Sequence, residues 1–497
     1  MMICFNGCDY KYETESVTKL FFPFEHFGFV FDGKNIPDDD RIIISEKEGR
    51  LSVNVNISGK TAEKQCPSGN TRSENEHRIC SSLFLILSDM TGIKPKWGCL
   101  TGIRPVKKAA ALAGKGMTEE EICSYLKENY FTDKFKSKLA YGIYLTQRKA
   151  LERLKDNSFS LYIGIPFCPT RCSYCSFVSH SIKKSGAKLI PEYVEKLCRE
   201  LEITADISRR LGLEIDTVYI GGGTPTAISA EELEKIMKKT AEVFDISRIS
   251  EYTVEAGRAD TITEEKLKVI KYYGAERISV NPQTMNDSVL EAIGRQHTAE
   301  QFIKSYELAR RVGFKYINTD VIAGLPTDTV GGFMHTIDSL TGLDPENITV
   351  HTLTVKRSAG LFPHSEEIKQ NISSGSVEEM TEYALEALTG KGYFPYYLYR
   401  QKNTVGNLEN TGYAKKGCES LYNIYIMDET QTILAAGAGA SSKLTNRRTG
   451  EICRAVNYKY PYEYLSDFDK MTEKKNRIVN DFICRSEDRR KDGGNLL

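Results

Sequence analysis

The sequence predicts an α/β fold built around one parallel sheet. Between residues 161 and 353, short apolar runs typical of buried strands alternate with charged segments of helical periodicity. Six such repeats, joined by right-handed crossovers, make a parallel sheet. If the sheet is curled, the fold is a partial, TIM-like (β/α)6 barrel. If the sheet is flat, the fold is a doubly wound sheet. Both forms place an active site at the carboxyl ends of the strands.

Each predicted element is a short segment of one pattern. The strands share an apolar run and are expected at Leu161–Pro166, Thr217–Gly223, Glu251–Gly257, Arg277–Gln283, Tyr316–Gly324 and Asn347–Leu353. The helices between them share a periodic apolar face and are expected at Ile190–Leu211, Ala230–Phe244, Thr263–Tyr273, Ala299–Val312 and Thr329–Leu340.

Residues 1–150 have a different pattern and are expected to form an N-terminal α+β accessory domain of unknown role. Alternating runs at Arg41–Ser45 and Leu51–Ile57 predict antiparallel strands. The polar stretch Ser58–Glu76 is expected to be a mobile loop. Helices are then expected at Arg78–Thr91 and Glu119–Gln147, with a small basic surface helix at Lys107–Lys115.

The rest of the chain is expected to form two further regions. Residues 151–385 form the (β/α)6 core, and residues 386–497 form a smaller C-terminal domain that caps the substrate. The C-terminal region holds an aromatic segment, Tyr393–Lys402, and a small-residue run, Ala435–Ser442. The last dozen residues are polar and are expected to fray.

Composition excludes several classes of protein. Lys and Arg together number 67, as do Asp and Glu, so the formal net charge is zero and no global basic surface points to nucleic acid. No apolar run of about 18 residues predicts a membrane span, and the start of the chain lacks the pattern of a signal peptide. We therefore expect a cytoplasmic protein, in which most of the thirteen cysteines are buried filler in a reducing compartment.

Three cysteines follow the first predicted strand with the spacing C-x3-C-x2-C: Cys168, Cys172 and Cys175. Three thiolates on one tight loop can hold three irons of a cubane [4Fe–4S] cluster and leave the fourth iron open for a small molecule. A zinc site usually needs four ligands in paired motifs, and only His180 stands nearby. A disulfide would leave one of the three cysteines over. The cluster is the favoured interpretation.

Polar or glycine-rich groups follow four of the other predicted strands. Gly221–Thr226 has the sequence GGGTPT, whose glycines let the backbone approach a ligand closely. It is not a phosphate loop, because no Lys-Ser/Thr follows. A simple tight turn could have the same sequence. Carboxylates can accept ribose hydroxyls, and an arginine can fork onto a carboxylate. The polar residues are Glu255, Gln283, Arg295 and Asp320. Each of them alone is more often a surface residue, but all four are expected at the same edge of the sheet, where the strands end.

These motifs resemble the radical SAM superfamily, and more narrowly the HemZ-type branch of the oxygen-independent coproporphyrinogen III oxidase group. The resemblance covers residues 160–445 and rests on Tyr162–Phe177, GGGTPT at 221–226, VEAGR at 254–258, SVNPQ at 279–283, GRQ at 294–296 and DVIAGLP at 320–326. It implies the curled form, a partial (β/α)6 radical SAM barrel.

The resemblance also implies the cofactors and the residues that bind them. Cys168, Cys172 and Cys175 would hold the [4Fe–4S] cluster, whose open iron would bind S-adenosyl-L-methionine (SAM). One or two SAM molecules are expected, because relatives in the group bind a second one. The positions that match SAM-binding residues are Tyr162, Tyr174, Gly222, Gly223, Thr224, Glu255, Gln283, Arg295, Asp320 and Ser441.

The resemblance implies an anaerobic oxidoreductase of porphyrin and heme biosynthesis. A 5′-deoxyadenosyl radical would start the oxidative decarboxylation of coproporphyrinogen III propionates to the vinyls of protoporphyrinogen IX. The expected partners are this tetrapyrrole and a low-potential electron donor such as flavodoxin or ferredoxin, and a monomer is expected. Arg400 and Lys402 are candidate partners for the substrate's carboxylates.

One residue departs from the pattern of the well-characterised oxidases. They have a fourth cysteine two residues after the third, where this chain has Phe177. The heme-chaperone branch of the group also has phenylalanine there, which favours an alternative in which heme is bound and delivered. A third interpretation is radical chemistry on heme itself. His351, at the end of the sixth strand, is a possible heme ligand, although a hydrogen-bonded structural role is favoured.

Overall fold

Six neighbouring parallel strands form the centre of the largest sheet. The computed structural model describes residues 1–23, 25–32, 40–102, 104–177, 179–183, 186–354, 356, 359–361, 374–401, 404–447 and 449–492. The strands lie side by side in chain order as β6 (Ser158–Ile165), β9 (Glu214–Gly222), β10 (Glu251–Gly257), β11 (Arg277–Val280), β12 (Tyr316–Ala323) and β13 (Asn347–Thr352). Every neighbouring pair is parallel. The predicted α/β barrel fold is confirmed.

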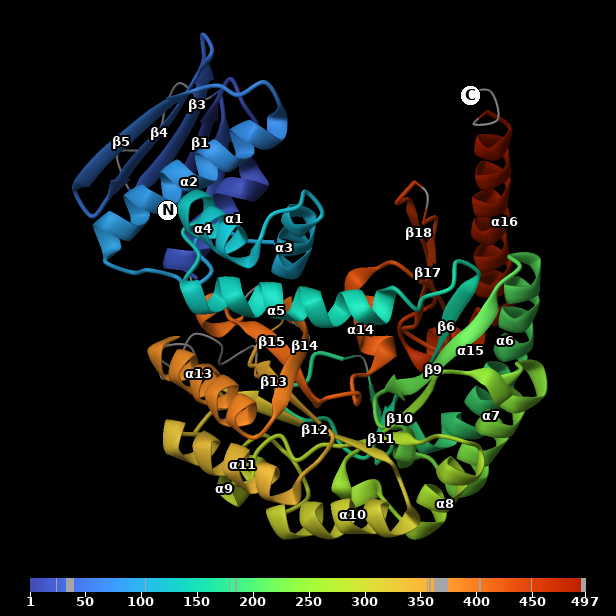
Figure 1. Ribbon diagram of the computed structural model, residues 1–497. Coiled ribbons are helices and arrows are strands. Elements are labelled where there is room, and N and C mark those ends of the chain that lie inside the picture. The colour runs from blue at the N-terminus through green and yellow to red at the C-terminus, as the bar shows by residue number, and fades with distance from the viewer. Residues whose placement is uncertain are drawn as a thin grey trace. The chain divides into compact units, whose positions relative to one another are not determined.

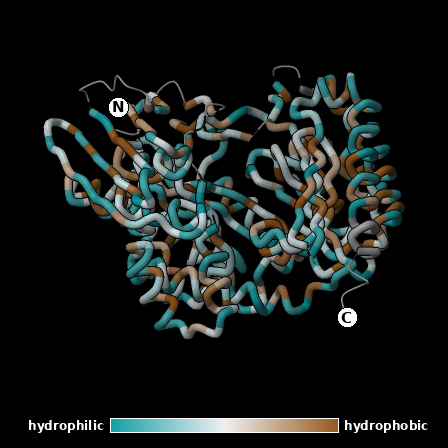
Figure 2. Tube along the Cα trace, turned by 90° about the horizontal axis from the view of Figure 1, so that it is seen from above, coloured by the Kyte–Doolittle hydropathy of each residue, from teal (hydrophilic) through white to brown (hydrophobic). Residues whose placement is uncertain are grey.

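The crossover helices also lie where the periodicity predicts them. They are α6 (Ile190–Arg210), α7 (Ala230–Val243), α8 (Glu264–Tyr272), α10 (Ala299–Val312) and α11 (Val330–Leu343), with the short α9 (Asp287–Ala292) between β11 and α10. Figure 1 shows α7, α8, α10 and α11 in an arc outside the strands. Apolar and polar stretches alternate along the helices in Figure 2, as expected of helices with one buried face. Within the described part of the chain, no helix combines the length and apolarity that a bilayer crossing requires.

Local sequence explains where these helices begin. Ser229 accepts a hydrogen bond from the backbone N–H of Glu232, and the Glu232 side chain accepts one from the N–H of Ser229, which makes a capping box at the start of α7. Thr298 and Gln301 make the same arrangement at the start of α10. These caps satisfy backbone donors that have no partner inside the helix.

The C-terminal part of the chain extends the same sheet at both ends. β16 (Thr432–Ala436) pairs in parallel with β6, and β17 (Ser441–Thr445) and β18 (Ile452–Val456) follow it. At the other end, β15 (Glu409–Lys415) pairs antiparallel with β13, and β14 (Tyr393–Arg400) lies at the edge. Among the described residues of this part lie the helices α13 (Ser374–Gly390), α14 (Leu421–Asp428), α15 (Pro461–Ser466) and α16 (Phe468–Asp492). The helix α16 reaches into the segment that was expected to fray.

The chain divides into two compact units. One comprises residues 1–144 and 399–408, and the other comprises residues 145–398 and 409–497. Most of the C-terminal segment thus clusters with the barrel. The division into an accessory domain, a core and a substrate cap remains a prediction.

The smaller unit is an α/β domain with its own core. Its sheet has the order β2 (Gly28–Phe31), β1 (Met2–Asn6), β3 (Arg41–Lys47), β4 (Arg50–Ile57) and β5 (Lys60–Pro67). Its helices are α1 (Lys11–Phe21), α2 (Arg72–Thr91), α3 (Pro105–Ala113) and α4 (Glu119–Tyr130), and α5 (Lys134–Leu151) leads into the barrel. Fully buried Ile3, Phe5, Ile42 and Val55 belong to its core.

The predicted mobile loop at Ser58–Glu76 is wrong. Residues 60–67 form β5, which pairs antiparallel with β4, and α2 begins at Arg72 behind the N-cap Thr71. Most side chains of β5 are exposed, so its polar composition reflects a strand open to solvent and not an unfolded segment. The single helix expected at 119–147 is also divided, because Phe131 adopts a left-handed conformation (φ 59°) that ends α4.

A buried ionic network joins α6 to the C-terminal segment. Glu200 on α6 is fully buried, and its carboxylate accepts hydrogen bonds from the Gly437 N–H (2.8 Å), the Asn457 amide (2.8 Å) and the Tyr464 hydroxyl (2.7 Å). Lys475 on α16 is 2% exposed and lies 3.0 Å from the same carboxylate. A buried charge is tolerated when pairing and hydrogen bonds replace the water that it loses.

We expect Lys475→Met to destabilise the protein by about 3–5 kcal/mol, because it leaves the Glu200 carboxylate buried without its cation. The double variant Glu200→Gln/Lys475→Met should lose less than the sum of the two single variants, because it buries no charge. Urea unfolding followed by circular dichroism measures both. Arg209→Met, which breaks an exposed pair with Asp206, is the matched control. Additive losses would contradict the network.

Candidate active site

The three-cysteine loop is closed at its base by backbone pairing. β7 (Phe167–Cys168) and β8 (His180–Ser181) pair in parallel, and the Ile182 N–H donates to the Cys168 carbonyl (2.9 Å). Inside the loop, the Cys175 N–H donates to the Cys172 carbonyl at 3.2 Å. Cys168 and Cys172 are buried, Cys175 is half-buried, and all three are free thiols.

The chemistry of these donors fits an iron–sulfur cubane. A cubane binds one thiolate at each iron, so three thiolates can hold three separate corners, whereas one zinc ion draws its ligands to one point. Within the described residues, no three His, Cys, Asp or Glu side chains converge on one point as a single metal ion requires. Burial raises the pKa of Cys168, and it raises that of Cys175 to about 11, so binding iron would displace protons.

The glycine-rich end of β9 lies directly against this loop. The Gly223 N–H donates to the Ile165 carbonyl and the Thr224 N–H to the Phe167 carbonyl, both at 2.8 Å. A Cβ atom on Gly223 would lie 2.6 Å from the Phe167 oxygen, so a larger residue would force the two segments apart. Gly222 has φ +113°, which side chains rarely adopt. The Thr224 hydroxyl lies 3.4 Å from the Cys168 sulfur.

Glu255 belongs to a half-buried group of aromatic and acidic side chains. The Tyr219 hydroxyl donates to the Glu255 carboxylate. The rings of Tyr162 and Tyr219 stack with centroids 6.2 Å apart, and Tyr422 stacks on Tyr219 at 4.4 Å. Burial raises the pKa of Glu255 to about 7, with a further contribution from the nearby charge of Asp320.

Gln283, three residues after β11, and Asp320, inside β12, are neighbours. The Gln283 N–H donates to the Asp320 carbonyl at 3.0 Å, and Gln283 has φ 71°. Burial opposes ionisation of Asp320, but the nearby His351 imidazole, a hydrogen bond from the Asn318 amide (2.7 Å) and the neighbouring Thr349 hold its pKa below the usual range. His351 lies 3.9 Å from this carboxylate, which agrees with the favoured structural role for that histidine.

Arg295 carries hydrogen-bond donors that no described protein atom accepts. One guanidinium nitrogen donates to the Tyr174 hydroxyl at 3.1 Å. Its Nε and Nη1 atoms are buried without a partner among the described residues, as is the Gln283 amide oxygen. Buried polar atoms of this kind are costly unless something binds them. They fit a ligand that carries both a carboxylate and donor groups, such as SAM.

The contacts of the described residues do not join three of the predicted residues to the other candidate site residues. Ser441 begins β17 with an exposed side chain, and within the described residues it makes no hydrogen bond to another predicted site residue. Arg400 is 3% exposed, bonds the Leu100 carbonyl and lies over the Trp97 ring in the smaller unit. Lys402 lies outside the described residues.

Sequence reasoning missed three residues of the site. Tyr219 pairs in register with Tyr162, so a two-residue period along β9 could have placed both rings on one face. Tyr422 comes from α14, about 200 residues further along the chain, and no local pattern indicates it. Arg258 stands in the VEAGR motif and bonds the cysteine loop, with its Nη1 atom 3.7 Å from the Cys172 sulfur.

Fold and site together define the class of protein. A partial barrel with three cysteines after its first strand and polar groups at later strand ends is a radical SAM architecture, and the Radical SAM superfamily matches residues 162–340. More narrowly, the chain belongs to the HemZ-type family of oxygen-independent coproporphyrinogen-III oxidase-like proteins, because it is 43% identical to one of them over 78% of its length. Its cofactors are therefore those of the superfamily, a [4Fe–4S] cluster and SAM.

Relatives in sequence support this assignment, and one solved structure supports the fold. The chain is 43% identical over 394 residues to the oxygen-independent coproporphyrinogen-III oxidase-like protein HemZ of Bacillus subtilis, covering 78% of each chain. It is 32% identical over 301 residues to the heme chaperone HemW of the same organism, covering 60% of this chain and 74% of HemW. The solved structure of Escherichia coli coproporphyrinogen III oxidase HemN shares the fold, with a TM-score of 0.50 at 21% identity, over 66% of this chain and 73% of HemN.

We expect Glu255→Gln to change how stability depends on pH. The unfolded chain releases the Glu255 proton near the ordinary pKa of 4.5, whereas the folded chain keeps it until about pH 7. Glu255 therefore contributes a loss of stability to the wild-type protein as the pH rises from 4.5 to 7, and the variant lacks this contribution. The melting temperature of the variant relative to wild type should rise over this range and level off above it. A constant difference would contradict the raised pKa, and Glu291→Gln is the exposed control.

Proposed function

We propose that this protein catalyses the oxygen-independent oxidative decarboxylation of coproporphyrinogen III propionates to vinyl groups, giving protoporphyrinogen IX in heme biosynthesis. The observation that carries the proposal is the convergence of the cysteine loop, the glycine-rich end of β9 and the unpartnered Arg295 donors at one end of the strands. The identity with HemZ supports the same assignment. In this proposal Cys168, Cys172 and Cys175 hold the cluster.

When bound, the cluster and SAM supply one-electron cleavage of the sulfonium and abstraction of a hydrogen atom from a propionate β-carbon. Loss of CO2 and of one electron to an acceptor then leaves the vinyl group. The side chains of this protein bind and orient the reactants, and they exclude the water that would divert the reaction.

Separate side chains hold separate parts of SAM in this proposal. The Nη1 atom of Arg295 donates to the SAM carboxylate and the Nε atom to another acceptor of the same ligand, and Tyr174 fixes the guanidinium through the third nitrogen. Glu255 and Asp320 accept hydrogen bonds from hydroxyl or amino groups. The stack of Tyr162, Tyr219 and Tyr422 covers one side of the site with aromatic surface. Gly222, Gly223, Thr224, Gln283 and Ser441 complete the proposed SAM contacts.

The setting of the reaction is part of the same proposal. The protein acts in the cytoplasm without oxygen, as a monomer that receives electrons from a low-potential donor such as flavodoxin or ferredoxin. A buried cluster of low potential suits such a donor.

A second candidate function is heme binding and delivery. Phe177 stands two residues after Cys175 and is 67% exposed, so an apolar ring is presented where a cysteine could otherwise bind. Exposed aromatic rings of this kind often mark a binding surface. The match to the heme chaperone HemW supports this alternative.

We expect Cys172→Ala to lose the cluster, because a cubane with two thiolates is held too weakly to survive gel filtration. Iron content should fall well below the wild-type value after anaerobic reconstitution. The EPR signal of the reduced cluster should disappear, and reductive SAM cleavage should fall at least tenfold. Cys198→Ala, at a half-buried cysteine on α6, is the matched control and should retain the iron content, the EPR signal and SAM cleavage. A Cys172→Ala variant with full iron would refute the proposed ligand set.

A product assay separates the two candidate functions. With coproporphyrinogen III, SAM and a reductant, the decarboxylase forms protoporphyrinogen IX and releases CO2 in proportion to the 5′-deoxyadenosine formed. The chaperone instead forms 5′-deoxyadenosine without decarboxylated product and binds one heme per chain. Mass spectrometry of the porphyrins and a heme titration measure these outcomes. Stoichiometric heme binding without product would overturn the decarboxylase assignment.

A further inference from the structure

Arg258 lies between the end of β10 and the cysteine loop. Its side chain is 4% exposed. The preceding Gly257 has φ +63°, which turns the chain sharply at the end of the strand. The Nη1 atom donates to the Thr170 carbonyl at 2.9 Å and to the Thr170 hydroxyl at 3.0 Å, and it lies 3.7 Å from the Cys172 sulfur.

The other two nitrogens of the same guanidinium hold Asp260. Nε donates to Oδ1 at 2.9 Å and Nη2 to Oδ2 at 2.7 Å, so the pair is bidentate. The Asp260 side chain is 17% exposed. The guanidinium therefore stands between a carboxylate on one side and the cysteine loop on the other.

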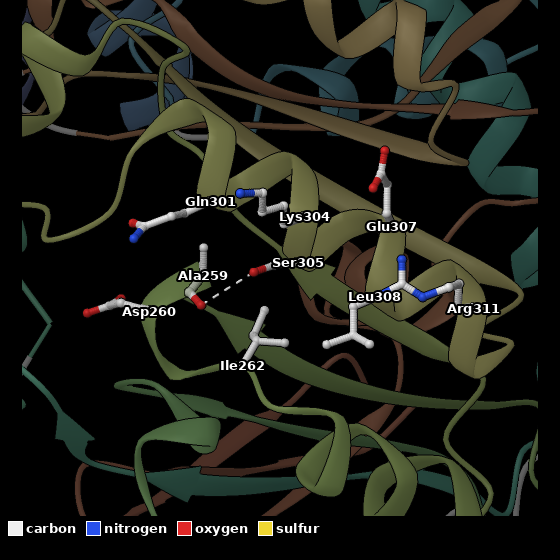
Figure 3. Close-up of a pocket in the computed structure, with 9 residues that line it drawn as sticks. All are labelled: Ala259, Asp260, Ile262, Gln301, Lys304, Ser305, Glu307, Leu308 and Arg311. Carbon is white, nitrogen blue, oxygen red and sulfur yellow. Dashed lines mark hydrogen bonds between the residues drawn. The ribbon is translucent and has the colours of Figure 1, made fainter.

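The turn that carries Asp260 is itself fixed. The residues Ala259–Thr261 form a short 3-10 helix whose Thr261 N–H and hydroxyl donate to the Arg258 carbonyl at 3.0 and 2.8 Å. Figure 3 shows Ser305 on α10 donating to the Ala259 carbonyl, at 3.4 Å, beside the pocket that Asp260 also lines. Asp260 cannot easily leave Arg258, so the pair acts as one rigid unit.

We propose that the Arg258–Asp260 pair sets the reduction potential of the cluster through Cys172. The inference rests on the proposed function, in which Cys172 is a cluster ligand. Hydrogen bonds to a ligand sulfur and net charge near it are principal controls of iron–sulfur potentials. A guanidinium is always charged, so Arg258 stabilises the more negative reduced cluster and raises the potential. Asp260 partly offsets that charge and lowers the potential. Arg258 is thus a positioning residue that acts through Cys172.

Two substitutions separate this effect from simple support of the loop. Arg258→Gln keeps a donor but removes the positive charge, so the midpoint potential should become more negative. Asp260→Asn keeps a hydrogen-bonding side chain but removes the negative charge, so the potential should become less negative. A purely structural pair predicts the same direction of change for both variants, because each breaks the same ion pair.

The test is an anaerobic redox titration of the reconstituted full-length protein, followed by EPR and without SAM. Arg248→Gln removes the same charge from an exposed residue just before β10, at the strand's opposite end, and should leave the potential unchanged. Shifts of opposite sign in the two variants support the inference. Shifts of the same sign, or no shift in either variant, overturn it.

Cluster assembly is measured first by iron content. If Arg258→Gln does not assemble a cluster, the redox titration of Asp260→Asn alone tests the inference. An unchanged midpoint potential in that variant overturns it. A wild-type protein that binds no cluster overturns the proposed function together with this inference. A wild-type cluster with normal SAM cleavage but no response to Asp260→Asn overturns the inference alone.

Discussion

The buried carboxylate of Glu200 is the interaction on which the geometry of the barrel unit depends. It fixes the turn after β16 through the Gly437 N–H, and it fixes α16 through Lys475. The Tyr193 hydroxyl continues the network, because it donates to the Gly164 carbonyl (2.7 Å) and accepts from the Ala438 N–H (2.9 Å). Gly164 stands four residues before Cys168 on the strand that leads into the cysteine loop. A carboxylate on α6 therefore fixes the C-terminal turn against the start of the site.

The same network explains why part of the fold could not be predicted from sequence. The six central strands and their helices were predictable, because long apolar runs alternate with periodic charged segments. The pairing of β16 with β6 joins residues about 270 positions apart, and the run Ala435–Ser442 is too short and too uniform to show a period. Contacts with Glu200 and Lys475 are what hold that run in place. The error at β5 has another cause, because an exposed strand is as polar as a loop.

The candidate site divides in the same way. The cysteines, the glycine-rich segment and the residues at Glu255, Gln283 and Asp320 were predictable, since parallel strand ends meet at one edge. Tyr422 was not, because it reaches the site from α14, an element whose position depends on tertiary packing. Arg258 follows the same strand as Glu255, but its contact with the cysteine loop is not visible in the sequence. Ser441 begins β17 with an exposed side chain, and its contact with SAM stays a prediction.

Glu255 and Asp320 show how one site can hold two carboxylates with different tasks. Burial beside Tyr219 and the charge of Asp320 raise the pKa of Glu255 to about 7, whereas His351, Asn318 and Thr349 hold the pKa of Asp320 below its usual range. Near neutral pH, Asp320 is therefore ionised while Glu255 is poised between its two forms. SAM carries positive charge on its sulfonium and amino groups, and a cation beside Glu255 would favour the carboxylate form. If SAM binds beside Glu255 as proposed, binding would expel the proton that part of the Glu255 side chains carry near neutral pH, so the negative charge of the site would increase on binding.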